Sequence, residues 1–302
     1  MRVSTALIHD TAVGSIQDQQ TKLLSLQQQV ATGRRAVKPS DDPIATARAL
    51  EVSQSKSVNN QFQLNQGYAK EALGLVENKL EGVKDILGYV RDQVVAAGNG
   101  TFSQSERDAV AIDLRARFDA LLSLANSQDG KGEYVFSGFK GDTQPFAGGL
   151  SGVTYQGDQG ERTMQVSTSR VLPVSNSGDE VFMKVPGSTE DLFSVISNFI
   201  TDLEDPLASM PAAVSTALTE LDSSFDNILR VQASIGSRVN EVEALENVSG
   251  DLDLQYAQAI SRLQDVDYAE AISDLTLEQT FLQAAQQSFL RVANLSLFNF
   301  LN

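Results

Sequence analysis

The chain of 302 residues contains no cysteine, no tryptophan and one histidine. Without cysteine it can form no disulfide, no zinc–thiolate or iron–sulfur site and no cysteine nucleophile. One histidine excludes a metal site built from several imidazoles, and a serine triad would have to use His9 as its base. His9 lies seven residues before Ile16, on what reads as a helix seam. We therefore predict no catalytic histidine, no metal and no cofactor.

Basic residues are scarce too: 23 Lys and Arg stand against 39 Asp and Glu, a formal net charge of −16. Nucleic-acid binding needs Lys and Arg to neutralise phosphates, so this balance disfavours a DNA or RNA partner. The excess is local, because residues 188–280 hold 18 acidic and 3 basic side chains, whereas residues 1–100 hold 10 and 11. The simplest interpretation is a solvated helix surface; selection of a basic partner is the alternative.

Long hydrophobic runs are also missing. No stretch approaches the roughly 18–20 apolar residues of a membrane span. The first ten residues lack the apolar core of a secretory signal peptide. We expect no membrane association and no Sec-dependent export.

The sequence is rich in seven-residue repeats of apolar side chains, the pattern of a coiled-coil seam. The repeats are Leu73, Leu80, Leu87 and Val94 with Val76, Val83, Val90 and Ala97, then Leu221, Ile228, Ile235 and Val242 with Leu218, Phe225 and Val239. The first set predicts an unbroken helix over about 45–97. A further helix is predicted to start at Ser103, which has capping-box spacing to Glu106. Its apolar face runs through Leu114, Phe118, Leu121 and Ala125.

Residues 131–187 have a different character. The segments 133–136, 153–155 and 163–167 read as strands, and the last of them alternates with period two. Residues 157–160 supply the glycines and aspartate that a hairpin turn needs. We predict a mainly α fold: a long antiparallel helical bundle or coiled-coil stalk formed by both chain ends, with a small β-rich insert.

The outermost segments are candidate assembly surfaces. In the N-terminal segment, Ile16, Leu23 and Val30 are seven apart, but glutamines fill much of the remaining seam, so an isolated helix would be marginal. The last turn, over 295–301, is apolar on every side and contains Leu295, Leu297, Phe298, Phe300 and Leu301; Phe289 precedes it in the same apolar stripe. One chain cannot easily bury both surfaces, which points to completion by neighbouring subunits.

The residue patterns that could indicate an active site or a metal site have structural explanations. Asp41 and Asp42 precede Pro43, so Asp42 is better explained as a helix N-cap with proline at the first helical position than as an acid–base pair. The spaced carboxylates at 251 and 253 and at 265 and 267 lack the following glycine and distal glutamate of a calcium loop. No glycine-rich phosphate-binding motif follows a strand. We predict no active site.

Several motifs resemble the hook-associated, hook–filament junction branch of the bacterial flagellin family. They lie at 1–5, 29–35, 39–43, 62–65, 97–101, 132–138, 265–270 and 296–301. Flagellin itself shares the helical ends and the paired aspartates, so a short flagellin is the competing interpretation. The context of 39–43 and the ending at 296–301 are more similar to the junction branch.

This resemblance implies a division of the chain into three parts. Residues 1–40 and 265–302 would form a terminal coiled coil, residues 41–130 and 188–264 a helical bundle with rods over 45–125 and 190–264, and residues 131–187 an outer insert. In that family the terminal segments are disordered in the free monomer and fold on assembly. Ordering on assembly costs entropy, which disfavours premature polymerisation.

The resemblance also implies a non-enzymatic adapter with Asp41, Asp42 and Pro43 fixing the turn into the second helix. Its partners would be the other hook-associated junction protein, flagellin and further copies of itself, in a ring of about eleven subunits. A cytosolic export chaperone would shield the C-terminal segment. The protein would be extracellular, in the flagellum, exported by the flagellar type III apparatus without a cleaved signal peptide.

Two functions from other classes stay open at this point. A glycan hydrolase would use two of Glu133, Asp142, Asp158 and Glu161, held about 5–10 Å apart. A secreted coiled-coil effector or phage fibre would share the heptads, but it would not need both chain ends to match the axial proteins.

Overall fold

The computed structural model describes residues 5–100 and 102–298. They form, in chain order, α1 (Thr5–Thr32), α2 (Pro43–Ala97), α3 (Gln104–Ala125), β1 (Phe146–Gly149), β2 (Gly152–Tyr155), β3 (Thr163–Ser167), β4 (Arg170–Pro173), the π-helical turn η1 (Asp179–Met183), α4 (Leu192–Glu204), α5 (Met210–Gln264) and α6 (Tyr268–Phe298). The mainly α fold with a small β-rich part is as predicted. None of the helices in these two described stretches is apolar over a length that would cross a membrane.

The chain divides into two compact units, each described here by itself. The first unit combines residues 1–58 with 251–302, and the second contains residues 59–250. Helices α2 and α5 contribute to both. The three-part division expected from the sequence, with its boundaries near 40, 130, 187 and 264, stays a prediction.

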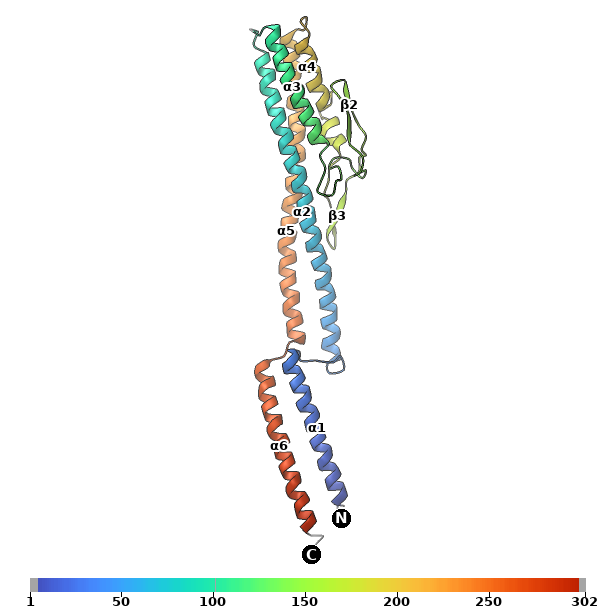
Figure 1. The fold of residues 1–302 in the computed structure, drawn as a ribbon, viewed down its shortest axis with the longest axis vertical. Helices are drawn as coiled ribbons and strands as arrows, with labels where there is room; N and C mark the ends of the chain where they lie inside the picture. The colour runs from blue at the N-terminus through green and yellow to red at the C-terminus, as the bar shows by residue number, and fades with distance from the viewer. Residues whose placement is uncertain (1–4, 101, 299–302) are drawn as a thin grey trace. The chain divides into compact units, whose positions relative to one another are not determined.

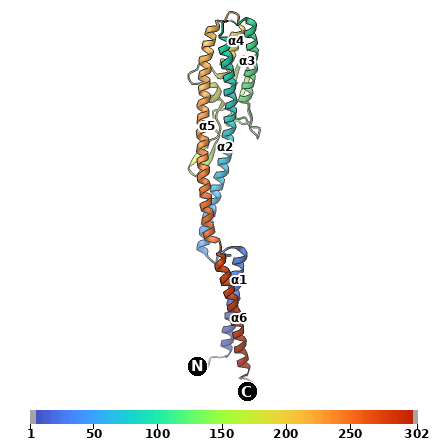
Figure 2. The same ribbon diagram turned by 90° about the vertical axis from the view of Figure 1, so that its left-hand side faces the viewer.

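In the second unit, α2 and α5 run antiparallel and side by side (Figures 1 and 2). The predicted heptad seam is confirmed, because both series of apolar residues from Leu73 to Ala97 are at most 2% exposed. On α5 the series Leu221, Ile228, Ile235 and Val242 is equally buried, whereas the accompanying residues Leu218, Phe225 and Val239 are only half-buried. Burial of this kind contributes about 1.5–3 kcal/mol for each large side chain, so the seam supplies much of the stability of this unit.

Helices α3 and α4 pack on one another at one end of this unit, beside α2 and α5 (Figure 1). The predicted start of α3 is confirmed: the Ser103 hydroxyl accepts the Glu106 N–H, and the Glu106 carboxylate accepts the Ser103 N–H. The predicted apolar face of α3 is fully buried. Five phenylalanine rings join α3, α4, β1, η1 and the loop before β1, with neighbouring centroids 5.2–6.0 Å apart: Phe118, Phe136, Phe146, Phe182 and Phe193.

The β-rich part consists of two separate antiparallel hairpins, β1 with β2 and β3 with β4. The predictions of strands at 153–155 and 163–167 are confirmed. The predicted hairpin turn at 157–160 is wrong, since this segment joins the two hairpins instead of closing one. Asp158 explains why: its Oδ1 accepts the N–H groups of Phe139 and Gly160, both at 2.8 Å, and folds the segment onto an earlier loop.

The predicted strand at 133–136 is also wrong, because only an isolated bridge between Tyr134 and Gln128 is formed there. Glycines with positive φ flank the segment, at Gly132 (86°) and Gly138 (75°), and bend the chain out of an extended course. Val135 and Phe136 are both buried although they are adjacent, whereas a half-buried strand would expose one of them.

The expected rod over 190–264 is broken. Helix α4 ends at Glu204 and α5 begins at Met210, with a loop between them that contains Pro206. Proline lacks an N–H and disfavours helical geometry in the residue before it, here Asp205, so the helix ends there. The loop is closed locally, since the Leu207 N–H donates to Asp205 Oδ1 at 2.9 Å.

Candidate assembly surface

In the first unit, α1 and α6 form an antiparallel pair (Figures 1 and 2). The predicted seam residues Ile16, Leu23 and Val30 are half-buried on α1, and Phe289 is half-buried on α6. The two chain ends therefore come together as a helix pair. Whether these residues make subunit contacts stays a prediction.

The segments that precede α2 and follow α5 meet in a short backbone junction. The Arg35 N–H donates to the Gln264 carbonyl at 2.8 Å, and the Val266 N–H donates to the Gly33 carbonyl at 3.0 Å. Gly33 has a φ of 70°, and a Cβ built there would lie 2.8 Å from Tyr268 Oη. Only glycine fits this position without strain, a requirement that the heptad pattern did not indicate.

The turn at 41–43 caps α2, as predicted. The Ala45 N–H donates to Asp42 Oδ1 at 2.9 Å, and Asp42 Oδ2 also accepts from Arg35 Nη2 at 2.9 Å. Asp41 Oδ2 accepts the Lys38 N–H at 2.8 Å and so closes the preceding turn. Pro43 is the first residue of α2, where its missing N–H costs no hydrogen bond.

Asp267 caps α6 in the same way. Its Oδ1 accepts the N–H groups of Ala269 at 2.9 Å and Glu270 at 3.3 Å. From the sequence, Asp265 and Asp267 were compared only with a calcium loop, which they do not match, so this capping role was not predicted. The signal was available, because an aspartate followed three residues later by glutamate has the spacing of a helix start.

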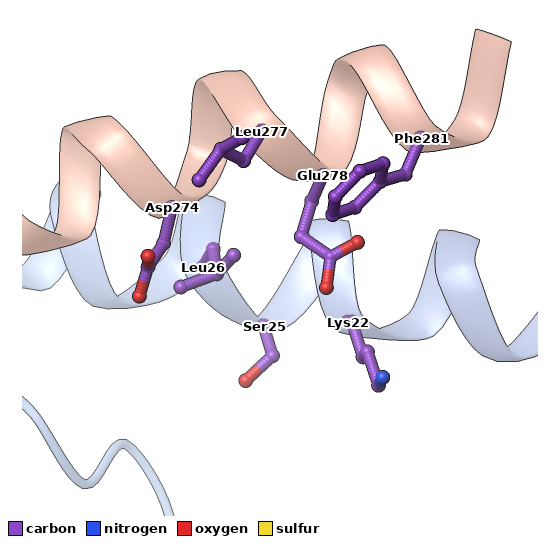
Figure 3. A pocket seen from close by; sticks show the side chains of 7 residues that line it. All are labelled: Lys22, Ser25, Leu26, Asp274, Leu277, Glu278 and Phe281. Atoms are coloured by element: carbon purple, nitrogen blue, oxygen red, sulfur yellow. The ribbon is translucent and has the colours of Figure 1, made fainter. Parts of the chain in front are cut away.

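A shallow groove lies between α1 and α6 (Figure 3). Figure 3 shows Glu278 and Phe281 extending from α6 toward the helix that carries Lys22, and Gln19 of α1 donates to the Glu278 carboxylate. The lining residues are Lys22, Ser25, Leu26, Asp274, Leu277, Glu278 and Phe281. The groove thus combines apolar side chains with charges of both signs.

Burial within this pair is incomplete. Of the described side chains in α1 and α6, only Ala271 is buried. Large apolar side chains are 49–60% exposed at Leu7, Leu24, Ile272, Leu277, Phe281 and Leu290. An apolar surface of this extent on a helix pair is typical of a site that another protein covers.

The predicted C-terminal surface is only partly described. Leu295, Leu297 and Phe298 fall within the helical backbone of α6, but their side chains are outside the described part. Phe300 and Leu301 lie outside the described residues. The role of this segment is taken up again as a proposal.

Three of the four carboxylates considered for glycan hydrolysis, Glu133, Asp158 and Glu161, are held in structural contacts. Glu133 accepts from Arg162 at 2.6 Å, and Glu161 Oε1 lies 3.9 Å from Arg238. The N–H groups of Phe139 and Gly160 stabilise the charged form of Asp158 and hold the pKa of that carboxyl below its ordinary value. A general acid needs a raised pKa instead, so Asp158 is unsuited to that role. The relatives described below give no support to a glycan hydrolase.

Comparison with known protein families defines the class. The bacterial flagellin N-terminal helical region matches residues 3–140, and the bacterial flagellin C-terminal helical region matches residues 213–301. These matches contain all of α1, α2, α3 and α6, and nearly all of α5. The chain is thus a flagellin-type protein, in which both ends contribute to the helical part.

Individual relatives narrow the class to a family. Flagellar hook-associated protein 3 of Escherichia coli K12 is 33% identical over 315 residues, covering 99% of each chain. The protein of the same name from Salmonella typhimurium LT2 is 31% identical over 315 residues, again with 99% coverage of both. The chain belongs to the flagellar hook-associated protein 3 family and is a structural component of the bacterial flagellum.

A solved structure supports the fold independently. The crystal structure of the flagellar junction protein of Legionella pneumophila superposes with a TM-score of 0.62. The alignment covers 72% of this chain and all of the other, at 23% sequence identity.

Proposed function

We propose that this chain is the adapter between hook and filament, and that it works through the surface of the α1/α6 pair. Its neighbours would be the other hook-associated junction protein on the hook side, flagellin on the filament side and further copies of itself in a ring of about eleven subunits. Its work is mechanical linkage, without a cofactor.

The incomplete burial of the α1/α6 pair carries this proposal. Two helices that bury only Ala271 among their described side chains gain little from pairing. Contacts with neighbouring subunits would cover Leu24, Leu277 and Phe281 and supply the missing stabilisation. Ordering of the pair would then be coupled to assembly, which prevents polymerisation before a template is present.

The weak pairing of α1 and α6 would also suit export. A chain that crosses the flagellar type III apparatus must be unfolded, and weakly paired terminal helices cost little to separate. We expect an export chaperone to bind the apolar C-terminal segment, which includes Leu297, Phe298 and Phe300. The exported protein would lie outside the cell in the flagellum.

Removal of residues 289–302 tests the role of the C-terminal segment. We expect loss of assembly and of chaperone binding, with thermal unfolding of the second unit unchanged, because its buried core lies in 59–250. Assembly is measured by sedimentation with flagellin, and unfolding by calorimetry. If the second unit melts at a lower temperature instead, the segment belongs to an ordinary core and the proposal fails.

A pair of point variants tests the surface of α6. Phe281 is 53% exposed on α6, and Phe139 is 68% exposed in the loop before β1. We expect Phe281→Asp to abolish swimming in a deletion strain, leaving hooks without filaments and flagellin in the medium. Phe139→Asp is the matched control and should restore motility. Equal complementation by both variants would contradict a role for this surface.

Circular dichroism tests the coupling of order to assembly. The monomer should gain helical signal on joining filaments, because the weakly paired helices α1 and α6 would be only partly populated in the free chain. Equal helicity in both states would exclude folding on assembly.

A further inference from the structure

Three polar side chains interrupt the buried seam between α2 and α5. Asn59 and Gln66 occupy the positions fourteen and seven residues before Leu73, and Ser249 occupies the position seven after Val242. These polar residues are 6%, 0% and 6% exposed. We refer to Asn59, Gln66 and Ser249 as the polar layer.

The polar layer is held by hydrogen bonds between α2, α5 and β3. Asn59 Nδ2 donates to the Ser249 carbonyl at 2.8 Å. Gln66 Nε2 donates to Ser249 Oγ at 3.0 Å and to the Val166 carbonyl at 2.8 Å. Gln66 Oε1 is buried and has no partner within the described part of the chain. The polar layer therefore joins α2, α5 and β3 in a specific way, but it buries less apolar surface than the neighbouring repeats do.

Burial differs sharply on the two sides of the layer. From Ala69 to Ala97, α2 buries a residue every three or four positions, about one in each turn. Before Asn59 the same helix buries only Ala45 and Ala49. Beyond Ser249, α5 buries no residue up to its end. The apolar stripe resumes at Val52 and Tyr256, but both are only half-buried.

We propose that the polar layer is a cooperativity boundary inside two unbroken helices. The backbone of α2 and α5 continues through it, but the turns over 43–58 and 251–264 open and close without opening the seam over 73–97 and 221–242. The boundary would let the terminal part of the molecule order and disorder while the core of the second unit stays folded.

The chemistry of the layer explains why it would stop the propagation of opening. Exposed amide and hydroxyl groups regain hydrogen bonds from water, so opening the layer loses little free energy. Opening an apolar repeat exposes hydrocarbon that water does not compensate. A region with few buried apolar contacts therefore opens separately from a well-packed one.

Hydrogen exchange of the full-length wild-type protein, read by mass spectrometry of peptides, tests the boundary directly. We expect amides in 43–58 and 251–264 to exchange at least about 100-fold faster than those in 73–97 and 221–242. The change should fall within two turns of Asn59 and of Ser249. Equal protection along the whole of α2, or a gradual decline without a step, would overturn the proposal.

Replacing the layer with apolar residues tests its cause. In the variant Asn59→Leu, Gln66→Leu, Ser249→Ala, the seam is continuous, and the difference in exchange across the boundary should fall to within about tenfold. Gln61→Leu is the control, since Gln61 is exposed on the same helix. If the control raises protection in 43–58 as much as the triple variant does, helix propensity is the cause and the layer is not. An unchanged step in a folded triple variant would also overturn the proposal.

Discussion

Helices α2 with α5 and α1 with α6 are both antiparallel pairs built on seven-residue repeats, yet they bury their side chains very differently. The α2/α5 seam carries Leu, Ile and Val at consecutive repeats, and these are at most 2% exposed from Leu73 to Ala97. The α1/α6 pair carries Ile16, Leu23 and Val30 with glutamines between them, and these three residues are only half-buried.

This difference in burial shows that the seven-residue repeat sets the geometry of a helix pair, whereas the residue types at the repeat set its stability. Each buried apolar side chain contributes about 1.5–3 kcal/mol, whereas a half-buried one with a polar neighbour contributes much less. Helices α3 and α4 add further burial to the second unit. The α1/α6 pair has no such cover among the described residues, and the proposed contacts with neighbouring subunits would supply it.

The largest expected contrast comes from removing one phenylalanine in each unit. Phe146 is fully buried, with ring centroids 5.2–5.3 Å from those of Tyr155, Phe182 and Phe193. Phe146→Ala should lower the unfolding free energy of the second unit by about 3–5 kcal/mol. Phe281→Ala should change the stability of the monomer by about 0.5 kcal/mol or less, because Phe281 is half-exposed. Urea unfolding measures both, and similar values would contradict the comparison.

A smaller difference in stability is expected between alanine substitutions of two glycines in the first unit. Gly33→Ala should destabilise the backbone junction by about 1–2 kcal/mol, because φ there is 70°. Gly14 lies in α1 with open space around its Cβ position, so Gly14→Ala should stabilise α1 by about 0.5–1 kcal/mol. Hydrogen exchange of α1 peptides gives both values. A stabilising Gly33→Ala would show that the junction tolerates rearrangement.

Removing the side chain that caps α2 should have a still smaller effect on stability. Asp42→Ala removes the acceptor for the Ala45 N–H and should cost about 1 kcal/mol at the start of α2. Asp41→Ala removes only the bond from the Lys38 N–H, outside the helix, and should cost less. Exchange rates of the amides at 44–48 distinguish the two variants. Equal losses would mean that the turn and not the cap fixes the helix start.

The smallest effect is a pH dependence in the second unit. Backbone N–H groups lower the pKa of Asp158 in the folded state below its ordinary 3.8. A lowered folded pKa gives stability that is present above pH 3.8 and is lost as the pH falls through the folded pKa. Asp158→Asn should therefore be less stable than the wild type at pH 6, with the difference shrinking between pH 4 and pH 2. Parallel pH profiles in urea titrations would refute this assignment.

The helical part of the fold was predictable because a heptad repeat identifies the buried face of a helix from residues that are close together in the sequence. The positions from Leu73 to Ala97 and the cap at Ser103 needed no knowledge of distant residues. The loop at Pro206 was equally predictable, since proline ends a helix, but the expected rod over 190–264 did not take it into account.

The β-rich part was less predictable because its bonds join residues far apart in the sequence. The Tyr155 hydroxyl contacts the Phe136 and Asp158 carbonyls and the Ser177 hydroxyl. No periodicity encodes such a set, so the segment around Phe136 was misread as a strand. In the candidate surface, the seam and Asp42 were readable, whereas the groove arises only when α1 and α6 are brought together.

The way in which the β-rich part attaches to α2 and α5 bears on how this protein can change over evolution. Asn65 and Gln66 of α2 donate to the main-chain carbonyls of Gln165 and Val166. Asn227 of α5 donates to the carbonyls of Glu180 and Val181. Every residue type offers the same carbonyl, so exposed side chains such as Gln165 can be exchanged without loosening the attachment. The exposed surface of the β-rich part can therefore diversify while the helices that hold it keep their sequence.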